Sequence, residues 1–157
     1  MNILCTQYSI QNKAFEIYVA GCAAQPHCKG CHNPETWDFD QGYCFTEKYF
    51  NQKIKPKIIQ FSDLIDNIWI LGGEPLDQDL DELKKFLTLL KQFDKKIWLW
   101  TRKGINQIPL DIKSLCDYIK CGRYVEKHKS ENNVQYGVKL ASKNQKIWRK
   151  TDGGYFV

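Results

Sequence analysis

The chain has 157 residues, a length typical of one globular domain, and we expect a single domain over residues 1–157. Hydrophobic residues make up 43% of the sequence and charged residues 26%, a balance that excludes disordered and fibrous proteins. The net charge of +5 comes from lysines interleaved with acidic residues rather than from one basic block, so we expect no nucleic-acid partner.

The N-terminal stretch MNILCTQYSIQNK lacks the basic start and the apolar segment of a signal peptide. The chain has no run of about 18 apolar residues, the length that a membrane-spanning helix needs. We therefore expect a cytoplasmic protein that does not bind membranes. Seven cysteines in a reducing compartment are poor candidates for disulfides, so any that cluster indicate metal or redox chemistry.

The first predicted element is a strand over residues 14–21, AFEIYVAG, in which β-branched and aromatic residues end at a glycine. It leads into a loop, GCAAQPHCKGCHNPETWD, that contains Cys22, Cys28 and Cys31. A C-x2-C pair lets two thiolates reach the same metal or cluster, and the third cysteine adds another ligand. Three thiolates leave one iron of a four-iron cluster open to a substrate or cofactor.

A closed zinc site is the alternative for this loop, because His27 or His32 would complete a Cys3His ligand set. The loop alone leaves zinc and iron–sulfur both open. The remaining cysteines have no ligand spacing and are expected to be small buried or edge residues: Cys5, Cys44, Cys116 and Cys121.

Residues 43–61 give weaker signals, with Thr46 as a candidate helix N-cap and Pro56 as an expected break. Two later segments are nearly continuous apolar runs, NIWILGG (67–73) and KKIWLWT (95–101). Runs without polar alternation are typical of strands that are buried on both faces.

Between these strands, DQDLDELKKFLTLLKQF (77–93) places its leucines and phenylalanines on one helical stripe. Asp79 and Glu82 resemble a capping box at the start of this helix, and lysines favour its C-terminal end. The stretch predicts the most regular helix of the chain.

A fourth strand is predicted over CDYIKCG (116–122), after a short helix around residues 112–115. Strand, helix and strand at this spacing are typical of βαβ units, so we expect an α/β fold with a mostly parallel sheet. Residues 124–157 are polar and mixed, and they predict loops with one short strand near 146–149.

Two glycine-bearing motifs fall at carboxyl ends of predicted strands, where ligands bind in parallel sheets: Gly21, and Gly72 with Gly73. In the GGEPL motif, the two glycines allow a backbone to approach a ligand closely, Glu74 offers a carboxylate to an ammonium group, and Pro75 stiffens the exit. Alone, GGEPL is as readily a tight turn before the helix. With three cysteines at the same edge, we interpret it as part of a ligand site.

The cysteine loop together with GGEPL resembles the radical S-adenosylmethionine superfamily, in which three cysteines hold a 4Fe-4S cluster and a GGEP motif receives the methionine ammonium of the cofactor. CHNPETWD (31–38) resembles the signature of the activating enzymes of glycyl-radical enzymes. Three further segments are similar to those of the activating proteins of anaerobic (class III) ribonucleotide reductases: IWLWTRKG (97–104), CGRYVEK (121–127) and GVKLASKNQKIW (137–148). The resemblance runs from about Phe15 to Trp148.

The resemblance implies that Cys22, Cys28 and Cys31 bind a 4Fe-4S cluster whose fourth iron takes S-adenosylmethionine. Reductive cleavage of this cofactor would generate a glycyl radical on the large subunit of an anaerobic ribonucleotide reductase. Flavodoxin or ferredoxin would donate the electron. The implied fold is an incomplete (β/α) barrel with the cluster loop after the first strand and an open side for the glycine loop of the partner.

The resemblance implies no catalytic residue beyond the cluster and cofactor sites. The residues expected at the cofactor are Gly72, Gly73, Glu74 and Pro75 at the methionine end, Arg123 near its carboxylate or the ribose, and Asn33 and Thr101 as polar contacts. As a strand-end and a turn residue, Thr101 and Asn33 are equally compatible with a structural role. Four aromatic residues follow the loop and are expected to line a docking surface or, at least as readily, to belong to the core: Trp37, Phe39, Tyr43 and Phe45.

The sequence departs from the family pattern at two places. Five residues, AAQPH, separate Cys22 from Cys28, where three are usual, and Cys121 occupies the place of a common Asp. Two other functions stay open: a radical enzyme acting on a small molecule, similar to 7-carboxy-7-deazaguanine synthase, and a zinc-binding module without catalysis.

Overall fold

The computed structural model describes residues 1–151 and 153–156. Among these residues, the main sheet has eight strands: β1 (Asn2–Ser9), β2 (Ala14–Ala20), β3 (Tyr43–Cys44), β4 (Asn67–Gly72), β5 (Lys96–Trp100), β6 (Tyr118–Cys121), β9 (Lys146–Thr151) and β10 (Gly154–Phe156). A separate hairpin is formed by β7 (Val134–Gln135) and β8 (Val138–Lys139).

The helical segments of the described chain are α1 (Glu47–Tyr49), a π-helical segment (Phe50–Ile54), α2 (Lys55–Gln60), α3 (Leu80–Leu90) and α4 (Leu110–Leu115). Short 3-10 turns occur at Pro34–Thr36, Ser62–Leu64, Pro75–Asp77, Ile105–Gln107 and Glu126–His128. None of the helices in this part of the chain combines the length and the apolar character that crossing a membrane requires.

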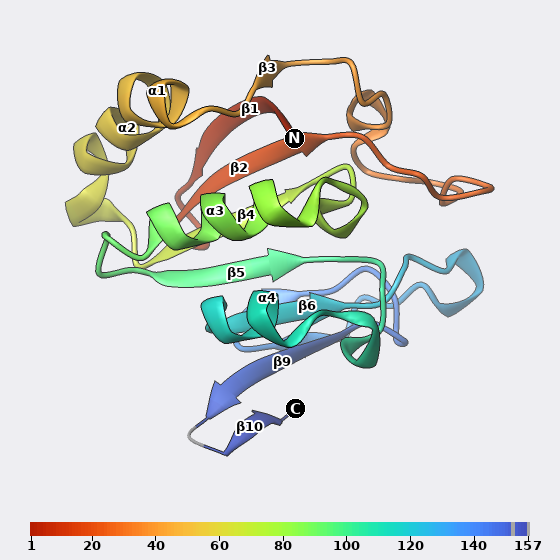
Figure 1. Ribbon diagram of the computed structural model, residues 1–157. Coiled ribbons are helices and arrows are strands. Elements are labelled where there is room, and N and C mark those ends of the chain that lie inside the picture. The colour runs from red at the N-terminus through yellow and green to blue at the C-terminus, as the bar shows by residue number, and fades with distance from the viewer. Residues whose placement is uncertain (152, 157) are drawn as a thin grey trace.

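The middle of the main sheet is parallel and its two flanks are antiparallel. The strand order is β10-β9-β6-β5-β4-β2-β1-β3, and β2, β4, β5 and β6 run parallel to one another. β1 and β3 add antiparallel on one side, and β9 and β10 on the other. Figure 1 shows the carboxyl ends of the parallel strands at one edge, together with the loop that follows β2. The predicted α/β class and its parallel strands are confirmed.

The sheet is open, so the expected incomplete (β/α) barrel is not confirmed. In the described residues, its edge strands β10 and β3 do not pair with each other. Residues 10–13 join β1 to β2, and so short a connection permits only antiparallel pairing. Between β6 and β9 the described chain forms one 3-10 turn and the β7–β8 hairpin but no crossover helix, and β9 pairs antiparallel with β6. Because β1 precedes it, the cysteine loop follows the second strand and not the first.

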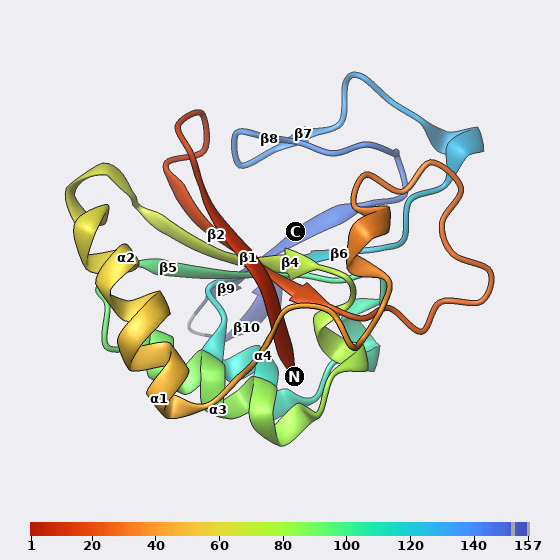
Figure 2. The same cartoon turned by 90° about the horizontal axis from the view of Figure 1, so that it is seen from above.

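Alternate residues of the central strands pack on opposite faces of the sheet. Ile68 and Ile70 of β4 belong to the core cluster that contains the helices, whereas Trp69 packs with Trp98 of β5 on the other face. Figure 2 shows the helices on one face and the β7–β8 hairpin on the other. Val138 of β8 joins the two tryptophans there. Both faces are covered, which explains the continuous apolar runs.

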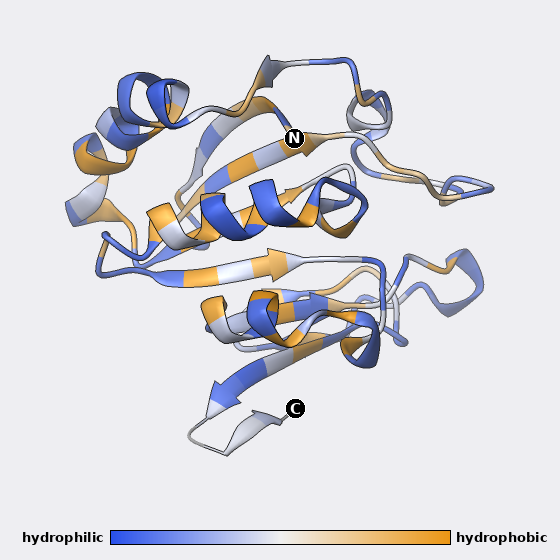
Figure 3. Ribbon diagram, viewed as in Figure 1, coloured by the Kyte–Doolittle hydropathy of each residue, from blue (hydrophilic) through white to orange (hydrophobic). Residues whose placement is uncertain are grey.

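Helix α3 packs on the sheet through the stripe expected from its sequence. Figure 3 shows apolar and polar stretches alternating along it. Its fully buried side chains are Leu83, Phe86, Leu87 and Leu90. Asp79 caps the helix, since its Oδ1 accepts a hydrogen bond from the Glu82 amide at 2.9 Å. The side chain of Glu82 pairs with the N-terminal ammonium of Met1 instead of completing a capping box.

The helical stretch after β3 runs through Pro56, which corrects the expected break. Thr46 caps its start as predicted, and its Oγ1 accepts a hydrogen bond from the Tyr49 amide at 3.0 Å. Pro56 lies in the first turn of α2, directly after the π-helical segment. At this point the hydrogen bonding changes from the π-helical to the α-helical pattern, and this change accommodates a residue that has no N–H to donate to the preceding turn.

The C-terminal region contains more strand than its sequence predicts. β9 covers the strand expected near residues 146–149, extends to Thr151 and pairs with β10. The β7–β8 hairpin was not expected. The positions of these polar segments depend on tertiary contacts and not on a local sequence pattern. β9 pairs with β6, and Val138 of β8 packs on the face of the sheet that carries Trp69 and Trp98.

Candidate functional site

A pocket of about 340 Å³ lies at the carboxyl ends of the parallel strands. This volume is within the range of about 300–1,000 Å³ that is usual for small-molecule sites. The predicted site residues that line it are Cys22, Cys28, Cys31, Asn33, Gly72, Gly73, Glu74, Thr101 and Arg123. Pro75 is buried but does not line the pocket.

The GGEPL motif contacts the start of the cysteine loop through its backbone. The Gly73 amide donates to the Val19 carbonyl at 2.9 Å, and the Glu74 amide donates to the Gly21 carbonyl at 2.8 Å. A Cβ atom on Gly73 would lie 2.2 Å from the Gly21 carbonyl oxygen, so only glycine fits there. The two motifs share one edge of the sheet, as predicted.

Gln78 also holds these two segments together, a role that the sequence did not reveal. Its buried side-chain amide donates to the carbonyls of Gly21 at 3.2 Å and Glu74 at 3.3 Å. A glutamine in a polar stretch before a helix gives no pattern by which this contact could be predicted.

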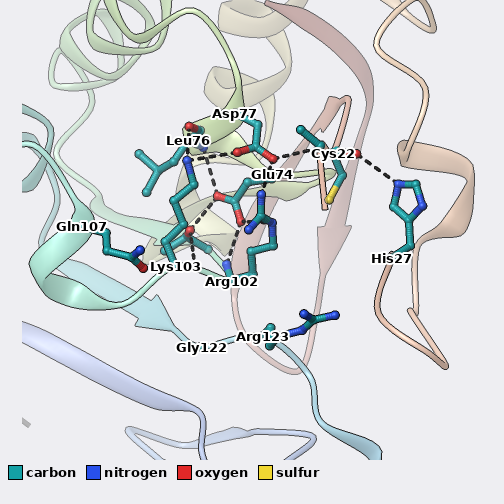
Figure 4. Close-up of polar contacts among 12 residues, drawn as sticks. Cys22, His27, Glu74, Leu76, Asp77, Arg102, Lys103, Gln107, Gly122 and Arg123 are labelled. Carbon is teal, nitrogen blue, oxygen red and sulfur yellow. Dashed lines mark hydrogen bonds and ion pairs between the residues drawn. The ribbon is translucent and has the colours of Figure 1, made fainter. Parts of the chain in front are cut away.

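The Glu74 carboxylate is buried and bonded to the end of β5. Its Oε1 accepts hydrogen bonds from the Thr101 hydroxyl at 2.6 Å and the Leu76 amide at 3.1 Å, and its Oε2 accepts one from the Arg102 amide at 2.7 Å. Burial raises the pKa of this carboxyl, and the three hydrogen bonds oppose the rise. Figure 4 shows these contacts, which join the turn after β4 to the turn after β5.

Contacts within the cysteine loop give it a definite path. The Cys22 amide donates to the Trp37 carbonyl at 3.0 Å, and the Cys31 amide donates to the Cys28 carbonyl at 3.1 Å. Nε2 of His27 lies 3.1 Å from the Cys22 carbonyl oxygen, and its ring stacks on Trp37 with centroids 4.1 Å apart. The last residue of the long AAQPH spacer is therefore tied to both ends of the loop.

The three loop cysteines lie on one pocket, and the two histidines that could complete a zinc set differ in their surroundings. Each is a half-buried free thiol on the same pocket. Of the two candidate zinc ligands, His27 is engaged as described, whereas His32 is exposed beside Tyr124 and lines the same pocket as the cysteines. In the described chain, no three His, Cys, Asp or Glu side chains are grouped so that they could hold a metal ion. The thiols share the pocket without a preformed ligand geometry.

Lys120 of β6 is a pocket residue that sequence reasoning missed. It is 8% exposed, its Nζ donates to the Gly122 carbonyl at 2.8 Å, and it lies 5.9 Å from the centre of the Trp100 ring. Burial lowers the pKa of this lysine to about 8. The signal that could have revealed it is a lone lysine inside the apolar run CDYIKCG, because alternation places it on the face opposite Ile119 and Cys121.

Arg123 follows β6 and is exposed, with its Nη2 3.3 Å from the Pro26 carbonyl oxygen to which it donates. It therefore links the fourth parallel strand to the spacer of the cysteine loop. Lys120 and Arg123 place two cationic side chains in the wall of the pocket, where each can bind an anionic group.

The four remaining cysteines lie outside the pocket lining, as predicted. Cys5 and Cys44 are exposed, and Cys116 and Cys121 are buried. Burial raises the pKa of the Cys121 thiol to about 12, and its side chain packs in the core on the helical face.

The aromatic residues after the cysteine loop are not one surface. Phe39 and Tyr43 are exposed and Trp37 is half-buried against His27, but Phe45 is 4% exposed and packs edge-on against Phe86. The expectation that Phe45 lines a docking surface is wrong, because its strand end turns the ring into the core.

Comparison with known proteins assigns the chain to a family. Residues 13–148 match the family described as 4Fe-4S single cluster domain. An anaerobic ribonucleoside-triphosphate reductase-activating protein of Enterobacteria phage T4 is 32% identical over 142 residues, which cover 87% of this chain and 84% of that protein. A protein of the same name from Pasteurella multocida is 30% identical over 149 residues, covering 86% of each. A pyruvate formate-lyase-activating enzyme of Listeria monocytogenes is 38% identical over 82 residues, 49% of this chain and 30% of that protein.

These similarities decide between the two metal chemistries that the loop sequence left open. The matched segment contains Cys22, Cys28 and Cys31, and the family is described by an iron–sulfur cluster rather than by zinc. The relatives confirm the resemblance to radical enzymes of the activating type, and with it a 4Fe-4S cluster and S-adenosylmethionine as cofactors. The chain belongs to the 4Fe-4S single cluster domain family and is a radical S-adenosylmethionine enzyme of the glycyl-radical-enzyme activating type.

Proposed function

We propose that this chain cleaves S-adenosylmethionine reductively and generates a glycyl radical on the large subunit of an anaerobic ribonucleotide reductase. The observation that carries the proposal is the pocket in which three free cysteines meet the GGEPL turn. The names of the relatives from phage T4 and Pasteurella multocida support the choice of reductase.

In this proposal, Cys22, Cys28 and Cys31 hold the cluster. When bound, the cluster and S-adenosylmethionine would supply the one-electron chemistry for reductive cleavage of the cofactor and for removal of one hydrogen atom from a glycine Cα of the partner. The protein has to orient the cofactor and exclude other C–H bonds and water.

Different residues around the pocket are suited to different parts of the cofactor. The turn of Gly72, Gly73, Glu74 and Pro75 would receive the methionine end, and its shape is fixed by the close packing of the two glycines on the backbone of β2 and the cysteine loop and by the hydrogen-bonded Glu74. Four polar side chains in the pocket lining complete the proposed cofactor contacts: Asn33, Thr101, Lys120 and Arg123. Lys120 and Arg123 suit the methionine carboxylate because a cation and a carboxylate form charge-assisted hydrogen bonds.

The open edge of the sheet suits a protein substrate. In the described residues, the helices cover one face of the sheet and leave the carboxyl edge to loops, so a glycine-bearing loop of the partner can approach the pocket (Figure 2). A flavodoxin or a ferredoxin is proposed as electron donor. A single domain over residues 1–157, a cytoplasmic location and the lack of a nucleic-acid partner stay predictions.

The first test is anaerobic reconstitution of the full chain with iron and sulfide, followed by S-adenosylmethionine and dithionite. We expect about four irons per chain and the release of 5′-deoxyadenosine and methionine. Cys22→Ala, Cys28→Ala and Cys31→Ala each abolish this release, whereas Cys5→Ala and Cys44→Ala retain it. Reconstituted protein that contains the cluster but releases no 5′-deoxyadenosine would contradict the proposal.

A further inference from the structure

The turn after β6 is held by two neighbouring side-chain amides from the segment that leads into β9. Nε2 of Gln145 donates to the Gly122 carbonyl at 3.2 Å, and Nδ2 of Asn144 donates to the Arg123 carbonyl at 2.9 Å. A Cβ atom on Gly122, whose φ is +98°, would lie 3.2 Å from the Asn144 carbonyl oxygen, so the two segments also pack closely. The position of this turn therefore depends on residues 21 and 23 places later in the chain.

Gln145 is itself fixed by the segments around the β7–β8 hairpin. Its side chain is buried, lines the pocket and accepts a hydrogen bond at Oε1 from the Ser142 amide at 3.1 Å. Its backbone carbonyl accepts hydrogen bonds from Nδ2 of Asn133 at 3.0 Å and from Nε2 of Gln135 at 3.2 Å. Both ends of the Gln145 side-chain amide are hydrogen-bonded, as is usual for a buried amide.

The Gly122 carbonyl connects Gln145 to Lys120 in the pocket wall. The same oxygen that accepts from Gln145 also accepts from Nζ of Lys120 at 2.8 Å. A carbonyl oxygen has two lone pairs, and these two donors use both. A lysine ammonium has three N–H donors, and the bond to Gly122 fixes the direction in which the other two are offered to an anion. Gln145 thus fixes the oxygen that orients the ammonium.

Arg123 connects the same turn to the spacer of the cysteine loop. Its Nη2 donates to the Pro26 carbonyl at 3.3 Å, while Asn144 holds its backbone carbonyl. A guanidinium has five N–H donors, so the bond to Pro26 leaves others for a carboxylate. Lys120 and Arg123 both line the pocket, and both belong to the chain segment that Asn144 and Gln145 hold.

We propose that Gln145 and Asn144 are positioning residues, which hold the turn after β6 so that Lys120 and Arg123 bind the carboxylate of S-adenosylmethionine together. The inference rests on the proposed function, in which these two cations meet that carboxylate. Donors that are fixed in advance bind more tightly than mobile ones, because less conformational entropy is lost on binding. The two amides therefore set the affinity for the cofactor and take no part in its cleavage.

The test measures the dissociation constant of S-adenosylmethionine by equilibrium dialysis against the reconstituted full-length chain, without a reductant, so that no cleavage occurs. For Gln145→Met and for Asn144→Ala we expect a constant about five- to tenfold higher, because each variant loses one orienting hydrogen bond. The iron content stays at the wild-type value. When dithionite is added, KM rises by the same factor and kcat stays unchanged, as for a loss of uniform binding.

Double variants separate a positioning role from a merely structural one. If Gln145 acts through Lys120, adding Gln145→Met to Lys120→Met raises the dissociation constant no further, and the same holds for Asn144→Ala added to Arg123→Met. Effects that add in full in these double variants would overturn the inference, and so would unchanged constants in both single variants. If Gln145→Met does not fold, the exposed Asn144 and its pairing with Arg123→Met decide the outcome.

Asn67, a half-buried side-chain amide at the start of β4, is the matched control at the opposite edge of the sheet. Its Nδ2 donates to the Asn12 carbonyl at 3.0 Å, and its Oδ1 accepts from Nε1 of Trp98 at 2.9 Å. Asn67→Ala is expected to lower the Tm and to leave the dissociation constant unchanged. A raised constant in this variant would overturn the inference, because destabilisation alone would then weaken binding. A wild-type chain that forms the cluster but binds no S-adenosylmethionine would instead refute the proposed function itself.

Discussion

Two buried charges lie in the wall of the pocket, Glu74 at 1% and Lys120 at 8% exposure. Burying a charge is costly unless hydrogen bonds or an opposite charge compensate it. Glu74 is compensated by Thr101 and two backbone amides, whereas the Nζ of Lys120 donates to one carbonyl, that of Gly122. The lysine therefore carries the larger uncompensated cost, and its cation is the one that an anionic ligand would stabilise.

Lys120 should make the stability of the folded chain depend on pH. Its folded-state pKa of about 8 lies below the ordinary value of 10.5, so between these pH values the unfolded chain binds more protons and stability rises with pH. From pH 7 to pH 10 this contributes about 2–3 kcal/mol to the free energy of unfolding. Urea denaturation of the metal-free protein should show that increase relative to Lys120→Met. Equal pH dependence in both proteins would contradict the assignment.

Gly73 is the position where a single methyl group should disturb the site most directly. The added Cβ of Gly73→Ala would lie 2.2 Å from the Gly21 carbonyl oxygen and 2.7 Å from the Thr36 carbonyl oxygen. We expect a loss of about 1–3 kcal/mol in stability, as for overpacking, and reduced iron uptake. Gly153→Ala, whose Cβ meets nothing within 4 Å, is the control. Thermal unfolding and iron analysis check both variants, and unimpaired iron uptake in Gly73→Ala would count against the close contact.

At the scale of elements, the turns after β4 and β5 form one unit. The Thr101 hydroxyl at the end of β5 donates to Glu74 at 2.6 Å and accepts a hydrogen bond from the Lys103 amide at 3.0 Å. Thr101 thereby aligns Arg102 with Asp77 and, through Asp77, with the cysteine loop. The loop is held by neighbouring strand ends more than by its own sequence.

Thr101→Val should weaken this unit without changing its volume. The substitution leaves Glu74 with one buried hydrogen bond fewer and the Lys103 amide without its acceptor, a loss that we expect to cost about 1–3 kcal/mol. Chemical denaturation measures the effect, and Thr101→Ser should recover most of it because the hydroxyl is retained. Thr88→Val on the exposed side of α3 is the control, with an expected change below about 0.5 kcal/mol. A comparable loss in the control would contradict the argument.

Elements with a strong local period were predictable and elements defined by their neighbours were not. The stripe of α3, the cap at Asp79 and the strand that became β4 follow from spacing alone. β1 was not predicted, because apolar and polar residues alternate only weakly along it. Its strand structure depends on antiparallel pairing with β2 across a tight turn. The path through Pro56 was missed because a π-helical segment has no simple sequence signature.

The site was predictable where chemistry concentrates in short motifs. Two motifs are recognisable from the sequence alone, the three-cysteine loop and GGEPL. The structure brings residues of both to one pocket, among them Cys22, Cys28 and Cys31. Gln78, Lys120 and the pair of Asp77 and Arg102 act across long sequence separations. Their roles depend on the parallel pairing of β4, β5 and β6, which no local pattern contains.

At the scale of the whole molecule, the open sheet is the feature that connects the fold with the proposed function. Helices pack on one face, the tryptophans and the β7–β8 hairpin cover the other, and the parallel strands direct their carboxyl ends toward the pocket (Figures 1 and 2). The antiparallel flanks end the sheet without closing it. A site at an open edge can accept a loop from another protein, which an enclosed barrel interior would not admit.

The most direct measurement is electron paramagnetic resonance of a class III ribonucleotide reductase after anaerobic incubation with the reconstituted chain, dithionite and S-adenosylmethionine. The account predicts a glycyl radical doublet on the reductase with the wild-type chain and with Cys44→Ala, and none with Cys28→Ala. Cleavage of S-adenosylmethionine without any glycyl radical would contradict the account and favour a small-molecule substrate.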